Sequence, residues 1–469
     1  MINLIVELSK YLLLILMALY TLECFTVFKQ TSEKRKKRLL RKQLFIIFTM
    51  DLVAFLVIYL KTEDQNIIIF YLAQIVYFIA VQVLYRIFYK KSSFLLLNHM
   101  CMLLSIGFIM LARLDMDSAV KQFKIVALST VIALIIPVII RKMKSLRNLS
   151  WLYAVLGFML LVVVFILGRT TYGAKLSISI AGFSFQPSEF VKIIFVFFVA
   201  TMLCRDTSFK QVVKTTAVAA AYVLVLVASK DLGSALIFFI TYTIMLYVAT
   251  KKVYYLGACL GGGSVAAVGA YYLFAHVRQR VSAWKDPMAV YDNEGYQIVQ
   301  SLFAIGTGGW FGMGLCQGSP GSIPIVKQDF IFAAICEELG GIFGMCLLLV
   351  CMSLFLMVVN IALQIKKPFY KLIALGLGTE YAFQVFLTVG GATKFIPLTG
   401  VTLPLVSYGG SSVLSTIIML AIIQGLYILR EDEGEELEKQ KEARRAAKKN
   451  PRRAKNERKV PKKEKETFY

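Results

Sequence analysis

The stretch GGIFGMCLLLVCMSLFLMVVNIA, residues 340–362, decides the fold class of this protein. It carries no charged side chain, and about 20 apolar residues in a helix cross a hydrocarbon core roughly 30 Å thick. Similar runs recur along most of the 469 residues, and the mean hydropathy of +0.70 is too high for a water-soluble domain. The runs lack the alternation of barrel strands, so each backbone amide must be satisfied within a helix. The sequence therefore predicts an all-α polytopic membrane protein.

Thirteen spans are expected. They cover residues 2–28, 44–60, 67–85, 95–111, 123–140, 151–167, 190–204, 213–228, 235–249, 255–275, 340–362, 372–389 and 411–427. The first run contains the acidic Glu7 and no small-residue cleavage site, which favours a retained span over a signal peptide.

The net charge of +24, from 52 Lys and Arg against 28 Asp and Glu, would suit a nucleic-acid-binding protein. However, the positive charge lies in short loops between apolar runs and in the tail, residues 431–469. That distribution is typical of the cytoplasmic side of a membrane protein. No nucleic-acid partner is therefore expected, and the tail is expected to be solvated, disordered or partly helical, and to rest on anionic lipids.

The same charges predict the orientation. The basic loop 29–42 is expected to be cytoplasmic, which places the N-terminus outside. Thirteen spans from that start put the other basic clusters, at 90–91, 141–147, 251–252, 366–367 and in the tail, on the cytoplasmic side. The external side receives loops 62–66, 115–122, 168–189, 230–233, 276–329 and 390–410. Loop 276–329 is too long for a simple connector, which usually indicates a binding or catalytic segment.

Lys and Arg residues beside the external loops lie on the side of the membrane where basic residues are disfavoured, so their presence requires an explanation. An anionic ligand such as a pyrophosphate supplies one, because arginine forks match phosphate oxygens. The closely spaced Arg278 and Arg280 are the strongest candidates, and snorkelling toward the interface is the alternative. The others are Arg169, Lys175, Lys230 and Lys285.

Asp329 stands out among the external carboxylates, because it lies where the long polar loop meets an apolar helix. Partial desolvation there would raise its pKa toward that of a useful general base, whereas an N-cap is the structural alternative. On a helix that starts at Asp329, Glu337 lies about 80° around the axis and is the better-placed helper. Glu338 lies on the far side, where an intramembrane charge usually needs a cation from another helix.

Residues 296–303 follow helical spacing and precede the glycine-rich residues 306–314. This pattern indicates an interfacial helix that ends in a tight turn, either roofing a groove or serving packing alone. The eight cysteines show no zinc spacing, and there are only two histidines. No metal ligand set or cofactor is therefore predicted, although the sequence leaves a divalent cation open.

The external motifs resemble those of the SEDS (shape, elongation, division and sporulation) family, which includes the RodA, FtsW and SpoVE proteins. The similarity covers residues 98–430. It lies in GAK at 173–175, QPSE at 186–189 with Lys192, DLGSA at 231–235, WKDP at 284–287 with GYQ at 295–297, DFIF at 329–332 with EELG at 337–340, and PL at 404–405 with SYGGSS at 407–412. Six motifs in order form a specific signal.

This resemblance implies a core of ten spans at 94–430, so residues 1–93 are an extension of about three transmembrane helices. It also implies a peptidoglycan glycosyltransferase of the bacterial cytoplasmic membrane that polymerises lipid II externally, beside a class B penicillin-binding protein. Asp329 occupies the position of the essential aspartate, and its implied role is general base. The expected substrate-binding residues are Arg278, Arg280, Lys175, Lys192, Glu189, Asp231, Glu337, Glu338 and Ser411.

The sequence departs from the family pattern at several positions. Leu176 and Ser177 replace a common Arg-Trp pair, Thr399 stands where lysine is common, and Thr388 stands where asparagine is common. Substrate contacts assigned to those positions therefore do not carry over. Lys394 is near enough in sequence to replace the missing lysine.

Two other functions compete with catalysis. A flippase for lipid-linked precursors would need a polar path through the bilayer, yet mid-depth ionisable residues are few apart from Asp51 and Glu380. Loss of the catalytic base would favour a non-catalytic scaffold for a division or elongation complex. Asp329 is present, which favours catalysis. The sequence does not separate elongation, division and sporulation roles.

Overall fold

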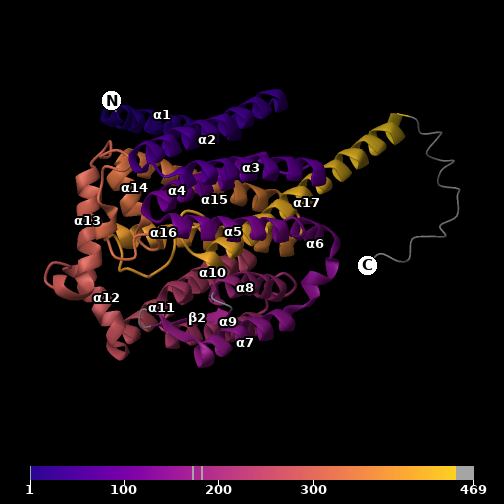
Figure 1. Ribbon diagram of the computed structural model, residues 1–469. Helices are drawn as coiled ribbons and strands as arrows, with labels where there is room; N and C mark the ends of the chain where they lie inside the picture. Colours follow the sequence, from indigo (N-terminus) through magenta and orange to yellow (C-terminus); the bar gives the residue numbers. More distant parts are fainter. Residues whose placement is uncertain (1, 172–173, 181–182, 450–469) are drawn as a thin grey trace.

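The protein is a bundle of long helices, described here from a computed structural model that covers residues 2–171, 174–180 and 183–449 (Figure 1). Within these residues, twelve segments are long and apolar enough to cross a membrane. The thirteenth expected span, α8 (Ser188–Leu203), has 16 residues, all of them buried except Phe190 and Ile194. Because it is enclosed by other helices, α8 does not need the length of a lipid-facing span.

The N-terminal extension consists of α1 (Ile2–Lys29), α2 (Glu33–Thr62) and α3 (Gln65–Phe88). Figure 1 shows these helices on one side of the bundle, at the top of the view; α1 packs on α15 (Gly341–Gln364) and α2 packs on α4 (Phe94–Leu114). Buried polar contacts fasten them. Asn98 donates to Gln43 at 3.0 Å and accepts from Gln82 at 3.0 Å, and Ser105 donates to Asp51 at 2.6 Å.

The remaining long helices and the short helix α6 complete the core. They are α5 (Met116–Ala133), α6 (Ile136–Lys142), α7 (Ser150–Leu167), α9 (Phe209–Ala228), α10 (Leu232–Thr250), α11 (Val253–Leu273), α16 (Pro368–Ala392) and α17 (Gly410–Lys449). The expected span 123–140 is interrupted between α5 and α6, just before Pro137. Pro137 lacks an amide hydrogen, so it cannot donate to the carbonyl of Ala133 four residues earlier, and α5 ends at that residue.

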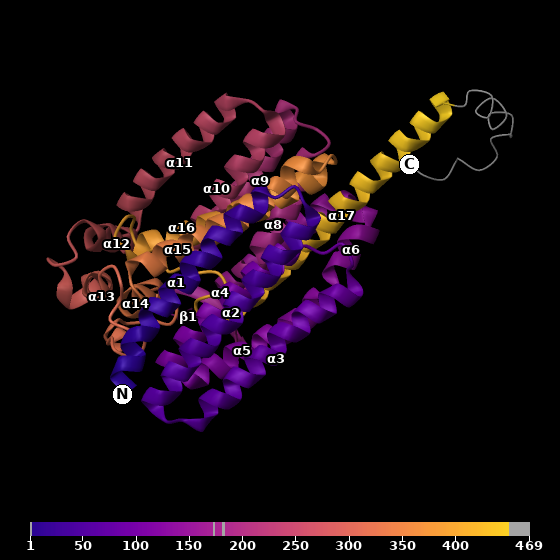
Figure 2. The same cartoon turned by 90° about the horizontal axis from the view of Figure 1, so that it is seen from above.

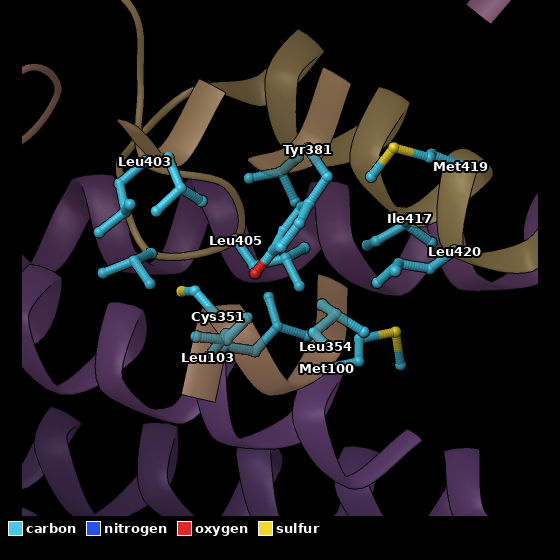
Figure 3. Close-up of a cluster of buried hydrophobic side chains, with 14 of the residues drawn as sticks. Met100, Leu103, Cys351, Leu354, Tyr381, Leu403, Leu405, Ile417, Met419 and Leu420 are labelled. Carbon is cyan, nitrogen blue, oxygen red and sulfur yellow. The ribbon is translucent and has the colours of Figure 1, made fainter. Parts of the chain in front are cut away.

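The centre of the core forms around Tyr381 of α16. Figure 3 shows this ring among apolar side chains of α4, α15, the 403–405 segment and α17, including Leu103, Leu354 and Leu405. The 405–406 backbone passes so close to α4 that a Cβ on Gly107 would lie 2.8 Å from the carbonyl oxygens of residues 405 and 406. A glycine at position 107 therefore allows the segment before α17 to enter the bundle.

One end of the bundle, which we call the tail end, gathers the basic loops around the first charged residues after the last span. Lys91 and Arg141 pair with Asp432 at 2.8 and 2.7 Å, and Lys367 pairs with Glu433 at 3.1 Å. Three of the predicted cytoplasmic loops, at 90–91, 141–147 and 366–367, therefore meet the start of the tail at one end. Helix α17 continues to Lys449, so this part of the tail is helical, and residues 450–469 lie outside the described residues.

The opposite end, which we call the Asp329 end, carries shorter elements. An unpredicted antiparallel sheet of β1 (Arg169–Thr171), β2 (Ala174–Ile180) and β3 (Phe183–Phe185) occupies the 168–189 loop. The long loop forms α12 (Ala275–Lys285), the helical turn η2 (Tyr291–Gly295), α13 (Tyr296–Gly308), the turn η3 (Pro320–Ser322) and α14 (Ile331–Leu339). The helix expected over 296–303 is present as α13, and Gly309 ends it with a φ of 56°. Helix η1 (Lys144–Asn148) lies at the tail end instead, in the basic loop between α6 and α7.

Candidate active site

Asp329 lies in the turn that leads into α14. The N-cap position of this helix falls on Phe330, so Asp329 is not the N-cap that the structural alternative required. The Asp329 carboxylate keeps partial solvent access, yet the surrounding protein raises its pKa to about 6, mainly because burial disfavours the charged form. The Arg280 guanidinium acts in the opposite direction and lowers this pKa. A carboxylate with this pKa is mostly ionised at neutral pH and is well suited to accept a proton.

The turn before α17 holds the backbone on the N-terminal side of Asp329. Ser407 donates its hydroxyl to the Gln328 carbonyl at 2.5 Å, and the Tyr408 amide donates to the Lys327 carbonyl at 2.7 Å. Gln122 of α5 fastens that turn, because its side chain donates to the Ser407 carbonyl and accepts from the Gly409 amide, both at 3.0 Å. The SYGG motif therefore acts as a backbone support for Asp329.

Arg280 is the cation that reaches this site. It extends from α12 and donates to the carbonyls of Leu398 and Thr399 at 3.3 and 3.2 Å. Gly400, with a φ of 73°, follows directly, and a Cβ added there would lie 3.8 Å from Oδ2 of Asp329. Arg278 is exposed and donates instead to the Tyr272 carbonyl at the end of α11, at 2.7 Å. The two arginines, expected to act together, diverge because residues two apart face opposite sides of a helix.

Asp231 brings a third charged group to the same place. It caps α10 by accepting from the Ser234 amide at 3.1 Å, and it also accepts from the Ser188 hydroxyl at 3.2 Å. Burial raises its pKa above the ordinary value. Both Asp231 and Asp329 interact electrostatically with Arg280. A side chain at Gly233 would clash with Val401, so the 399–401 segment packs directly on the first turn of α10.

Glu189 and Lys192 form a buried ion pair beneath this cluster, at 2.6 Å. Lys192 also donates to Gln384 at 2.7 Å, and Gln384 in turn donates to the Thr402 carbonyl at 3.0 Å. Ser415 donates to Glu189 at 2.9 Å. In this structure the pair therefore supports the 402–415 segment rather than facing an open surface.

The paired glutamates of α14 serve different neighbours. Glu338 is fully buried and pairs with Arg113 of α4 at 3.0 Å, as its place on the far side of the helix predicted. Burial raises the pKa of Glu338 to about 7. Glu337 accepts from the Ser319 amide at 2.8 Å, so its carboxylate is directed into the preceding loop. This contact fastens the loop to α14, and the expected role of Glu337 as a helper of Asp329 stays a prediction.

Other expected residues lie around the cluster. Ser411 accepts from the Gln186 amide at 2.9 Å, which ties the start of α17 to the QPSE motif. The side chains of Lys175 and Leu176 lie outside the part of the chain that the structure describes. Thr388 donates to the Val401 carbonyl at 2.9 Å, and the Lys394 carbonyl accepts from Trp284 at 3.1 Å. In the described residues, no group of three His, Cys, Asp or Glu side chains is placed to hold a metal ion.

Sequence reasoning missed Gln122, Gln384 and Gly400. Gln384 is a buried polar residue inside an apolar run, and a buried amide generally needs partners, so this signal was present. Gln122 is also buried, but it lies between Lys121 and Lys124 at the end of the expected loop 115–122, where the sequence gives no such signal. Gly400 follows a threonine in a loop, and only its left-handed φ beside Asp329 reveals its role.

The helical bundle and the charged cluster of Asp329, Arg280 and Asp231 define a multi-pass membrane protein with a candidate active site at one end. The chain belongs to the FtsW/RodA/SpoVE family, described as cell cycle proteins, whose sequence profile matches residues 93–431. Helices α1 to α3 precede the matched region.

Two relatives illustrate the similarity. The peptidoglycan glycosyltransferase RodA of Mycobacterium tuberculosis is 34% identical over 367 residues, covering 72% of this chain and 78% of the relative. The stage V sporulation protein E of Bacillus subtilis is 35% identical over 289 residues, covering 59% of this chain and 77% of the relative.

Solved structures share the fold. The rod shape determining protein RodA of Thermus thermophilus aligns with a TM-score of 0.55 at 22% identity, covering 72% of this chain and 96% of that one. A chain from a peptidoglycan synthase complex that coordinates polymerization and crosslinking aligns with a TM-score of 0.61 at 23% identity, covering 72% and 98%. At these identities the similarity shows the fold alone.

Proposed function

We propose that this protein polymerises lipid II on the outer face of the cytoplasmic membrane, with Asp329 as the general base. The chain is a peptidoglycan glycosyltransferase, in line with its family and with the names of its relatives. The observation that carries the assignment of the base is the convergence of Asp329 with Arg280 and Asp231 at one end of the bundle.

In the proposed reaction, Asp329 takes the proton from the 4-hydroxyl of the incoming lipid II. The resulting oxygen nucleophile attacks the anomeric carbon of the donor glycan, and the bond from that carbon to the pyrophosphate breaks with inversion. The polyprenyl pyrophosphate leaves with the electron pair of that bond. Arg280 lies beside Asp329 and would offset the negative charge that develops on the leaving group.

The orientation follows from charge. The basic loops meet at the tail end, which we assign to the cytoplasm because short cytoplasmic loops carry an excess of Lys and Arg. The Asp329 end then faces outside, and anionic lipids are the proposed contact of the basic tail. A class B penicillin-binding protein is the proposed partner, because a structurally similar chain comes from a complex of polymerization and crosslinking.

The burial of the two mid-depth carboxylates, Asp51 and Glu380, favours catalysis over lipid transport. Asp51 is fully buried and accepts hydrogen bonds from Ser105 and Gln74. Glu380 is 1% exposed. Neither lines an open polar path through the described bundle, which a flippase would need.

Purified full-length protein should polymerise purified lipid II, and Asp329→Asn should reduce the rate by about 10² to 10⁴, the usual range of general-base catalysis. Asparagine keeps the size and removes the basic oxygen, so the variant should still insert and bind lipid II. Glycan chain formation and lipid II binding would be measured side by side. Near-wild-type glycan chains from Asp329→Asn would remove Asp329 from the mechanism, and Glu337→Gln would be the next variant to test.

A further inference from the structure

Helix α1 lies outside the region that the family profile matches, yet its first turns reach the Asp329 end of the bundle (Figure 2). Figures 1 and 2 both place the first turns of α1 near α14, and the two helices are in contact. Val6 of α1 is 1% exposed, and its Cγ1 atom lies 3.5 Å from the position of a Cβ added to Gly314. The rings of Tyr11 and Phe311 are in contact, with centroids 6.1 Å apart.

The partners of Val6 and Tyr11, Gly314 and Phe311, belong to residues 308–319, which we call the glycine segment. Main-chain hydrogen bonds join it to the C-terminal half of α14. The amides of Met313 and Gly314 donate to the carbonyls of Glu337 and Glu338, both at 2.9 Å. Together with the bond from the Ser319 amide to the Glu337 carboxylate, these contacts make the glycine segment and α14 one connected unit.

Helix α1 also contacts α14 directly. Leu13 of α1 is 2% exposed and lines a small cavity together with Leu339 of α14 and Phe343 of α15. The Thr21 hydroxyl lies 3.5 Å from the Cys346 carbonyl, which fixes α1 along α15. Helix α1 therefore packs against both the glycine segment and the C-terminal end of α14.

Helix α14 connects the glycine segment to Asp329. The helix has nine residues, all of them buried, and it begins two positions after Asp329. A short buried helix moves as a rigid unit, because its packed neighbours leave no room for bending. The support of the glycine segment by α1 is therefore connected to the position of the Asp329 carboxylate.

We propose that α1 is a positioning element for the reaction: through Val6 and Tyr11 it holds the glycine segment, and through α14 it sets the position of Asp329. This inference rests on the proposed role of Asp329. It assigns a task in catalysis to a part of the chain that the family profile does not include.

The first test uses Tyr11, which is 44% exposed, so that its replacement leaves the buried core intact. Tyr11→Ala should lower kcat for lipid II polymerisation by roughly five- to tenfold and leave KM within about twofold, because small misplacements of a catalytic group slow the chemical step. Tyr11→Phe keeps the ring and should restore the rate. The matched control is Ile15→Ala, one turn along the helix and 55% exposed.

A second readout does not depend on activity. Hydrogen exchange at the amides of Met313 and Gly314 should accelerate in Tyr11→Ala and in Val6→Ala, but not in Ile15→Ala or Val6→Ile. Unchanged exchange in both alanine variants would overturn the contact between α1 and the glycine segment. Faster exchange with unchanged kcat would overturn the positioning role alone. If the wild-type protein did not polymerise lipid II, the proposed function would fail, and the positioning role would fail with it.

Discussion

Asp329 combines partial desolvation, which makes its carboxylate more basic, with a position beside a cation, which favours the ionised form. Burial raises its pKa to about 6, while Arg280 keeps the pKa from rising further, and Asp231 is the second carboxylate that interacts with this arginine. Because only the ionised carboxylate accepts a proton, the pKa of Asp329 predicts how the rate depends on pH.

We expect kcat/KM for polymerisation to be nearly constant above about pH 7 and to fall as the pH drops through about 6, where Asp329 becomes protonated. The measurement is a pH profile of the rate of purified protein at a lipid II concentration well below KM, where the rate is proportional to kcat/KM. Glu337→Gln is the control, since this carboxylate is fastened to Ser319 and should leave the acidic limb in place. A profile that stays flat down to pH 5 would contradict the assignment.

At the scale of the element, α12 separates two arginines that look equivalent in the sequence. Arg280 faces the 398–400 segment and Asp329, whereas Arg278 faces the end of α11. Arg280→Gln should therefore weaken lipid II binding and reduce polymerisation at least tenfold, because a guanidinium beside a pyrophosphate makes charge-assisted hydrogen bonds. Arg278→Gln is the matched control and should stay within about twofold of wild type. Binding of lipid II and chain formation by the two variants would decide, and equal losses would contradict the geometry.

At the scale of the whole molecule, the charges at the two ends imply one orientation. The basic loops and the start of the tail are joined by ion pairs at the tail end, and the charged cluster of Asp329 lies at the other end. The first basic loop, residues 29–42, follows a single span, so it determines where the N-terminus lies.

We therefore expect reporter fusions after Phe28 and after Arg430 to give a cytoplasmic signal, and a fusion within residues 286–290 of the long loop to give an external one. A fusion after Leu167, at the end of α7, is a further external control. An external signal after Phe28 would contradict the orientation. External signals both after Phe28 and within residues 286–290 would also contradict the position of α1 in the positioning role.

The sequence by itself determined the class of protein, the course of nearly every helix, the shared side of the basic loops and the candidate base. These are local properties, because a run of apolar residues must form a helix in lipid and a cluster of lysines resists translocation. The break before Pro137 is local in the same sense, although it was not predicted. The separation of Arg278 from Arg280 also follows from helix geometry alone.

Only the tertiary structure decided which distant residues meet. Asp231, Arg280, Gly400 and Asp329 come from four separate segments, and nothing in the apolar pattern of a lipid-embedded helix says which of its faces touches a neighbour. The burial of the Glu189 and Lys192 pair and the contact of α1 with the glycine segment are of the same kind. Helices in lipid associate through close packing and buried polar contacts, and these depend on shapes that form only when the bundle is assembled.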